Sequence, residues 1–213
     1  MTKLTKLIAI ALATTLLSSG AALAEDYGPW QVRVRMITIA PQESSTVSIG
    51  GFSDHSVQIV PEVDISYFFS DNWSAELILA TSKHSANGWN TALGDLDLGS
   101  IWVLPPTLTL QYHLMPGQIV NPYVGAGANL TFFYGQSFDA GSPIIDISHS
   151  ASFGPALQAG VDIQTGGDWF LNLDLKKIWI QTDAVVNAGA LGVATADVSL
   201  DPLVFGVGIG RRF

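Results

Sequence analysis

Beyond its first two dozen residues, the chain alternates large apolar side chains with polar or small ones at a period of two. The alternation recurs in eight segments of about ten residues, the length of a tilted strand that crosses a bilayer. The segments are Trp30–Ala40, Val57–Phe69, Trp73–Ser82, Leu104–Leu114, Pro122–Tyr134, Ser152–Gln164, Trp169–Gln181 and Asp197–Phe213. The pattern predicts an all-β protein with eight antiparallel strands.

Short and long connections alternate strictly between these segments. The short ones contain SDN, MPGQIVN and TGGD, and the long ones cover residues 41–56, 83–103, 135–151 and 182–196. Outer-membrane barrels show this asymmetry, with short turns at the periplasmic rim and long loops outside. The connections therefore predict an up-and-down transmembrane β-barrel with both termini in the periplasm.

The amino-acid composition favours a membrane protein. Only 13% of the 213 residues are charged, and the mean hydropathy is +0.35. No apolar run of about 18 residues follows the N-terminal segment, so the sequence offers no transmembrane helix. An exported apolar chain of this kind can enter lipid as a closed barrel. The alternative is a soluble β-sandwich whose aromatic residues form its core.

The N-terminus resembles a secretory signal. Lys3 and Lys6 precede the apolar stretch LIAIALATTLL, and ALA precedes Glu25. This order predicts a cleaved signal peptide over residues 1–24 and a barrel over 25–213, and the alternative is a retained membrane anchor. We expect export to the outer membrane of a Gram-negative bacterium.

Charge and cysteine content exclude several classes of function. Removing both signal lysines leaves 7 basic residues (9 − 2) against 18 acidic ones, a formal charge of −11. Nucleic-acid binding needs clustered basic residues, so we expect no nucleic-acid partner. The chain has no cysteine, which excludes thiolate metal sites.

Aromatic residues gather near both ends of the segments, as amphipathic rings do at membrane interfaces. The set nearer the short turns is Trp30, Phe69, Trp73, Tyr112, Trp169 and Phe213. The set nearer the long connections is Phe132, Tyr134, Phe153 and Trp179. Side chains at every second position of a strand, on the same face as these aromatic rings, are expected to face lipid.

The opposite parity turns charged residues of both signs into the lumen, near the periplasmic rim and the middle. They are Arg33, Arg35, Glu62, Asp64, Glu76, Asp162, Asp174 and Lys176. An unpaired buried charge is very costly, so we expect these groups to pair across the narrow interior. The sequence predicts a polar plug.

Toward the long connections, the inward positions become apolar. They are Ile37, Ile39, Val60, Ile78, Ala80, Phe133, Ile178, Ile180, Leu200 and Val204. Two interpretations compete for this set: the residues fill a packed core, or they line a pocket that accepts a hydrophobic molecule from outside. Prolines in the strand segments add a second pair of alternatives, because each removes a ladder donor. Pro61, Pro105, Pro106, Pro155 and Pro202 mark either strand ends and bulges or a weak wall through which a ligand leaves sideways.

Several blocks in register resemble the OmpW family of small outer-membrane proteins. They are SDNWSAEL, LPPTLTLQYHL, NPYVGAGANLTFF, GPALQAGVDIQTGGDWFLNLDLKKIWI and VSLDPLVFGVGIGRRF. The resemblance implies a monomeric eight-stranded barrel with a hydrophobic channel open to the outside and closed below by polar residues. It also implies uptake of small hydrophobic molecules, with lateral exit into the membrane. Arg211 departs from the family, which commonly has an aromatic residue there.

The remaining chemistry offers weaker alternatives. His55, His84 and His149 lie in long connections near serines and acidic residues, which leaves a lipid-modifying enzyme as one alternative and a structural or receptor barrel as another. No spacing demands a catalytic or metal site, so we predict no enzyme, no metal and no cofactor. His113 is expected to be isolated near the periplasmic rim. Predicted partners are outer-membrane lipids, lipopolysaccharide, small hydrophobic solutes and the barrel assembly machinery.

Overall fold

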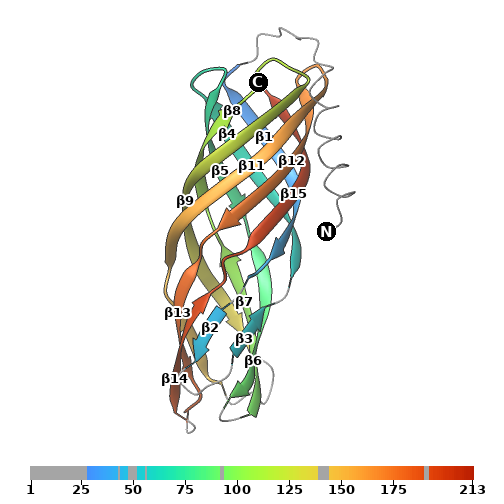
Figure 1. Cartoon of the computed structure of the whole chain (residues 1–213). Coiled ribbons are helices and arrows are strands. Elements are labelled where there is room, and N and C mark those ends of the chain that lie inside the picture. The colour runs from blue at the N-terminus through green and yellow to red at the C-terminus, as the bar shows by residue number, and fades with distance from the viewer. Residues whose placement is uncertain are drawn as a thin grey trace, which may run out of the picture.

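A computed structural model describes residues 28–42, 44–47, 52–55, 57–91, 94–138, 144–189 and 192–213. These residues form an elongated β-structure, with the C-terminus at the end that holds the short turns (Figure 1). No described helix has both the length and the apolar character needed to cross a membrane. The predicted signal peptide, residues 1–24, lies outside the described residues and stays a prediction.

The predicted eight-stranded antiparallel barrel is confirmed. Its strands pair in the order β1, β4, β5, β8, β9, β11, β12 and β15, and β15 pairs with β1 to close the wall. Their bounds are β1 (Trp30–Ala40), β4 (Gln58–Phe68), β5 (Trp73–Ala80), β8 (Thr107–His113), β9 (Val120–Ser137), β11 (Ser152–Gly166), β12 (Trp169–Ile178) and β15 (Leu203–Arg212). Closure leaves no edge in this part of the wall, as a lipid environment requires.

Inward and outward positions follow the predicted parity. In β12, for example, Leu171, Leu173 and Leu175 are exposed while Asn172 and Asp174 between them are buried. Trp169 and Trp179 lie at the two ends of this outward row. Ten residues of strand at about 3.4 Å each, tilted by about 40°, span roughly 26 Å, which matches the apolar band of an outer-membrane barrel.

The prediction that residues 41–56, 83–103, 135–151 and 182–196 are loops is wrong, because strands occupy most of them. The additional strands are β2 (Ser44–Val47), β3 (Phe52–His55), β6 (Ser82–Thr91), β7 (Gly94–Leu104), β10 (Asp146–His149), β13 (Gln181–Asn187) and β14 (Val193–Ser199). A strand above the bilayer needs no apolar outer face, so these polar strands lack the pattern used to find the others.

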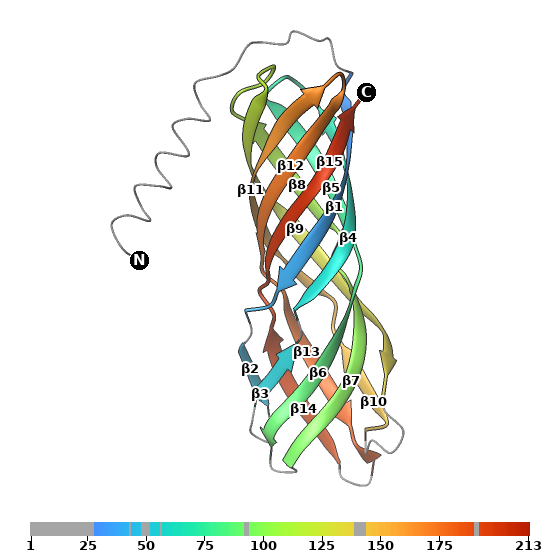
Figure 2. The same cartoon turned by 90° about the vertical axis from the view of Figure 1, so that its right-hand side faces the viewer.

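Beyond the outer end of the closed barrel, which is drawn at the bottom of Figures 1 and 2, the wall divides into two sheets. One side continues through β9, β7, β6 and β3, while β10, β13, β14 and β2 form a separate four-stranded sheet, here called the outer sheet (Figure 2). A small apolar cluster joins the two sides. Ile144, Ile147 and Ala184 are buried there, with Leu98 of β7 and Phe138, which follows β9, packed against them.

Steric crowding inside the barrel explains why glycines occupy the inward positions of β15. A Cβ atom at Gly208 would overlap the backbone of β1 at Val34 and Arg35, and one at Gly210 would overlap the Phe170 ring. Gly206 is less confined, since its nearest neighbours would lie 3.2 Å away. The alternation of large residues and glycine therefore places apolar side chains outside and leaves room inside for arginines of β1.

Candidate functional site: an apolar pocket above a charged plug

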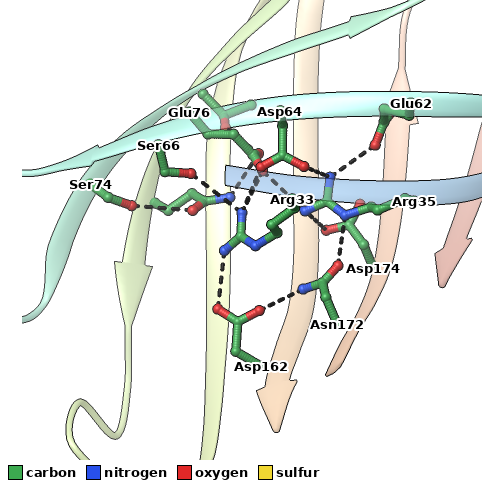
Figure 3. Close-up of polar contacts among 12 residues, drawn as sticks. Arg33, Arg35, Glu62, Asp64, Ser66, Ser74, Glu76, Asp162, Asn172 and Asp174 are labelled. Atoms are coloured by element: carbon green, nitrogen blue, oxygen red, sulfur yellow. Dashed lines mark hydrogen bonds and ion pairs between the residues drawn. The ribbon is translucent and has the colours of Figure 1, made fainter. Parts of the chain in front are cut away.

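The eight predicted lumen charges meet in one cluster, here called the charged plug, and Figure 3 labels each of them except Lys176. Its members are Arg33 and Arg35 on β1, Glu62 and Asp64 on β4, Glu76 on β5, Asp162 on β11, and Asp174 and Lys176 on β12. Their side chains are at most 9% exposed. Alternate positions on strands that face one another bring these residues together.

Arg33 lies between three carboxylates. Its Nη1 is 3.1 Å from Asp64 Oδ1 and 2.7 Å from Glu76 Oε1, and its Nη2 is 3.0 Å from Asp162 Oδ2. Each contact is short enough for a charge-assisted hydrogen bond. A single guanidinium thus joins strands β4, β5 and β11 across the lumen.

Arg35 and Lys176 extend the network toward the outer end. Arg35 Nη1 is 2.9 Å from Glu62 Oε1 and 2.9 Å from Asp64 Oδ2, and its Nη2 is 3.0 Å from Glu76 Oε1. Lys176 Nζ lies 2.7 Å from Glu62 Oε1 and 3.0 Å from Asp174 Oδ1. Every predicted plug residue therefore contacts an opposite charge.

Neutral side chains complete the network, and the sequence did not single out two of the most important. Tyr123 donates a hydrogen bond to Asp174 Oδ2 at 2.7 Å, and Asn172 donates to Asp162 Oδ1 at 2.7 Å. Gln111 donates to Glu76 Oε2 at 2.8 Å. The alternation along β9 and β12 places Tyr123 and Asn172 at inward positions, which was a signal in the sequence, but their residue types did not indicate a role in the plug.

The expectation that His113 is isolated is wrong. The ring is fully buried and lies between Phe68 and Tyr123, with centroid distances of 4.8 and 5.3 Å. Its two nitrogens lie 3.2 Å from Ser74 Oγ and 3.1 Å from Asn121 Nδ2. His113 is a packed residue beneath the plug because the barrel is narrow enough for rings from β4 and β9 to reach it.

An apolar pocket lies on the outer side of the plug, here called the upper side. It encloses about 900 Å³, open space at its mouth included. Nine of the ten predicted residues line it: Ile37, Ile39, Ile78, Ala80, Phe133, Ile178, Ile180, Leu200 and Val204. The tenth, Val60, packs against the cluster of buried residues that forms part of this lining.

Several lining residues come from the segments that we expected to be loops. They are His84, Ile101 and Val103 on β6 and β7, and His149 and Thr182 on the outer sheet. His84 Nε2 lies 2.8 Å from Ser82 Oγ, and the His149 ring stacks on Phe133 at 5.1 Å. Alternation in GSIWVL was the signal that could have identified Ile101 and Val103.

The plug separates this pocket from a smaller polar one at the periplasmic end. Glu62 and Lys176 line the upper pocket, whereas Asp162 lines the lower one, together with Gln31 and Arg212. The ion pairs of the charged plug lie in the lumen between them. The two cavities therefore lie on opposite sides of a continuous network of charges.

The wall beside the pocket has a local gap in its backbone pairing. The ladder between β4 and β5 ends at Glu62 and Ala80, and pairing of this wall resumes between β3 and β6 at His55 and Ala86. Pro61 lies at the start of the gap. On the outer surface of the wall beside this gap, the side chains of Val57 and Ile59 are 61% and 68% exposed.

Other prolines do not leave a comparable gap. Near Pro155 and Pro202, the backbone N–H groups of Trp179 and Ile178 donate to the carbonyl oxygens of these prolines at 3.1 and 3.2 Å. Asp201 Oδ1 also accepts from Ile180 N at 3.0 Å. Pro155 lies within β11, while Pro105, Pro106 and Pro202 mark breaks between successive strands.

No group of three or more His, Asp or Glu side chains is arranged to hold a metal ion in the part of the chain that the structure describes. Asp97 has a local structural contact, since its Oδ1 accepts a hydrogen bond from Gly99 N at 2.7 Å.

This chain is similar to known outer-membrane proteins in both sequence and structure. The model of the OmpW family matches residues 26–213. The uncharacterized outer-membrane protein y4mB of Sinorhizobium fredii is 39% identical over 193 residues, which cover 90% of this chain and 82% of that protein. The dibenzothiophene metabolism operon protein PahQ of Pseudomonas aeruginosa is 35% identical over 196 residues, with coverages of 87% and 89%. The crystal structure of the outer membrane protein OprG from Pseudomonas aeruginosa matches with a TM-score of 0.82 and 27% identity, covering 88% of this chain and 96% of that chain.

Proposed function

This chain belongs to the OmpW family, as an outer-membrane barrel of a Gram-negative bacterium, and we propose that it is a passive channel for small hydrophobic molecules. The observation that carries this proposal is the apolar pocket closed below by the charged plug. Burying apolar surface favours entry of an apolar solute from water by about 25 cal/mol per Å². The plug opposes further passage, because an apolar solute would have to break buried ion pairs to reach the periplasm.

The gap near Pro61 supports lateral exit into the membrane. Val60 and Ala80 lie beside the pocket cluster, and Ile59 and Leu79 point outward on the same two strands. An apolar solute that crosses the wall here meets apolar side chains on both sides. Such a route needs no passage through the plug.

The name of one relative is consistent with a solute of this class. PahQ is named for dibenzothiophene metabolism, and dibenzothiophene is a flat apolar molecule. We extend to this chain only the class, a small hydrophobic compound. Transport fits this site better than catalysis. The relatives of the chain are outer-membrane barrel proteins, and the wall of the pocket is mainly aliphatic.

Partners follow from the same proposal. Lipid surrounds the outward apolar band, and lipopolysaccharide surrounds its outer end. The assembly machinery binds the C-terminal strand β15 and Phe213, which follows it. The barrel works as a monomer, since one chain closes the wall and encloses the pocket.

Uptake by two charged variants tests the proposed function. Replacing Ile78 or Ile178 with aspartate places a charge in the pocket wall, and we expect uptake of naphthalene into protein-containing liposomes to fall about tenfold or more. The control Ile78→Val keeps the wall apolar and should behave like the parent. If both aspartate variants insert as heat-modifiable barrels and still transport like the parent, the pocket is not the route.

A further inference from the structure

The floor of the apolar pocket is an ion pair. Glu62 and Lys176 are members of the charged plug that also line the pocket, and Lys176 Nζ lies 2.7 Å from Glu62 Oε1. The two side chains are 3% and 2% exposed. A molecule that fills the pocket to its inner end therefore meets buried charged groups there.

This ion pair retains hydrogen-bonding capacity. An ammonium group has three donors, and the two neighbours of Lys176 Nζ in the plug are Glu62 Oε1 and Asp174 Oδ1. Glu62 Oε1 accepts from both Arg35 and Lys176, whereas Glu62 Oε2 accepts no hydrogen bond from the residues that the structure describes. The floor can thus offer a ligand one donor and one acceptor side by side.

We propose that the pocket selects apolar molecules that carry one terminal hydroxyl group, such as phenols and alcohols, and binds the hydroxyl on the Glu62–Lys176 pair. This inference rests on the proposed function and adds the substrate class. A hydroxyl group donates one hydrogen bond and accepts others, so it can donate to Glu62 and accept from Lys176. The apolar body then lies between Ile78 and Ile178.

Charge balance argues against a carboxylate as the polar group. The plug contains three basic and five acidic side chains, a formal charge of 3 − 5 = −2. A ligand carboxylate would increase this imbalance in a buried site, where charges interact strongly. A plain hydrocarbon gains no hydrogen bond on the floor. A site that can hydrogen-bond a substrate hydroxyl discriminates against the analogue that lacks it.

Binding of three related ligands tests the inference. Naphthalene, 2-naphthol and 2-naphthoate are titrated at pH 7.5 into the full barrel in nanodiscs, and each affinity is corrected for partition into protein-free nanodiscs. We expect 2-naphthol to bind on the order of tenfold more tightly than naphthalene, and 2-naphthoate to bind more weakly than 2-naphthol. Equal corrected affinities for naphthol and naphthalene would overturn the inference and leave the proposed function standing. Failure of all three ligands to bind would overturn both.

A pair of variants locates the hydroxyl group. Glu62→Leu removes the acceptor on the pocket floor and should reduce the preference for 2-naphthol to less than threefold. Asp162→Leu removes the same charge from the periplasmic side of the plug, away from the pocket, and should retain the preference. A preference that survives in a folded Glu62→Leu barrel would contradict binding on the floor. If Glu62→Leu does not fold, the ligand series on the unmodified barrel still decides the proposed class.

Discussion

At the scale of single residues, Arg33 is the centre of the charged plug. It is fully buried and contacts Asp64, Glu76 and Asp162 at 2.7 to 3.1 Å. Arg33→Met removes the cation and leaves three buried carboxylates without it, so we expect the free energy of unfolding to fall by about 3–5 kcal/mol. Urea unfolding in lipid vesicles, followed by tryptophan fluorescence, measures the loss.

Arg211 provides the matched control. It forms an ion pair with Asp168 at 3.0 Å, with the two side chains 42% and 43% exposed. An exposed pair contributes about 1 kcal/mol or less, so Arg211→Met should change the free energy of unfolding by no more than that. Equal losses in the two variants would mean that the plug does not stabilise the barrel.

At the scale of secondary-structure elements, the outer sheet differs from the closed barrel. Its four strands end in two edges, β10 and β2, whereas every strand of the closed barrel has two partners. Backbone groups at an open edge exchange with solvent more easily. We expect hydrogen exchange to be faster in the edge strands β10 and β2 than in β12 and β15, and Ile147→Asp, which disrupts the apolar cluster, to accelerate exchange in β10 further.

The barrel strands serve as an internal reference for this experiment. The Ile147→Asp change should leave exchange in β12 and β15 unaltered, because the side chain lies in the cluster that joins the outer sheet to β7. Uniform acceleration in all four strands would show that the outer sheet is not a separate unit.

At the scale of the whole molecule, two cavities lie on one axis with the charged plug between them. In the proposed function, hydrophobic molecules enter the upper cavity from outside and leave for the membrane through the gap near Pro61. Five strands supply the plug, and both upper sheets supply the pocket wall. The proposed function is therefore a property of the closed barrel and the outer sheet together.

The sequence predicted the part of this molecule that lies in lipid. There the apolar outer face of each strand imposes a period of two, which located the eight barrel strands, the plug residues and nine of the pocket residues. It did not predict the strands outside the bilayer, because water does not require an apolar outer face. His84 and His149 were interpreted as loop residues for that reason. Whether the upper lumen is packed or hollow depends on side-chain volumes across the barrel, which periodicity cannot report.

The most direct test is a crystal structure of the barrel with 1-bromonaphthalene bound, since bromine gives an anomalous signal that locates the ligand. The proposed function predicts a bromine peak inside the upper pocket, among Ile78, Ile178 and Phe133. Bromine found only among the lipid-facing side chains, with the upper pocket free of ligand at saturating concentration, would contradict it.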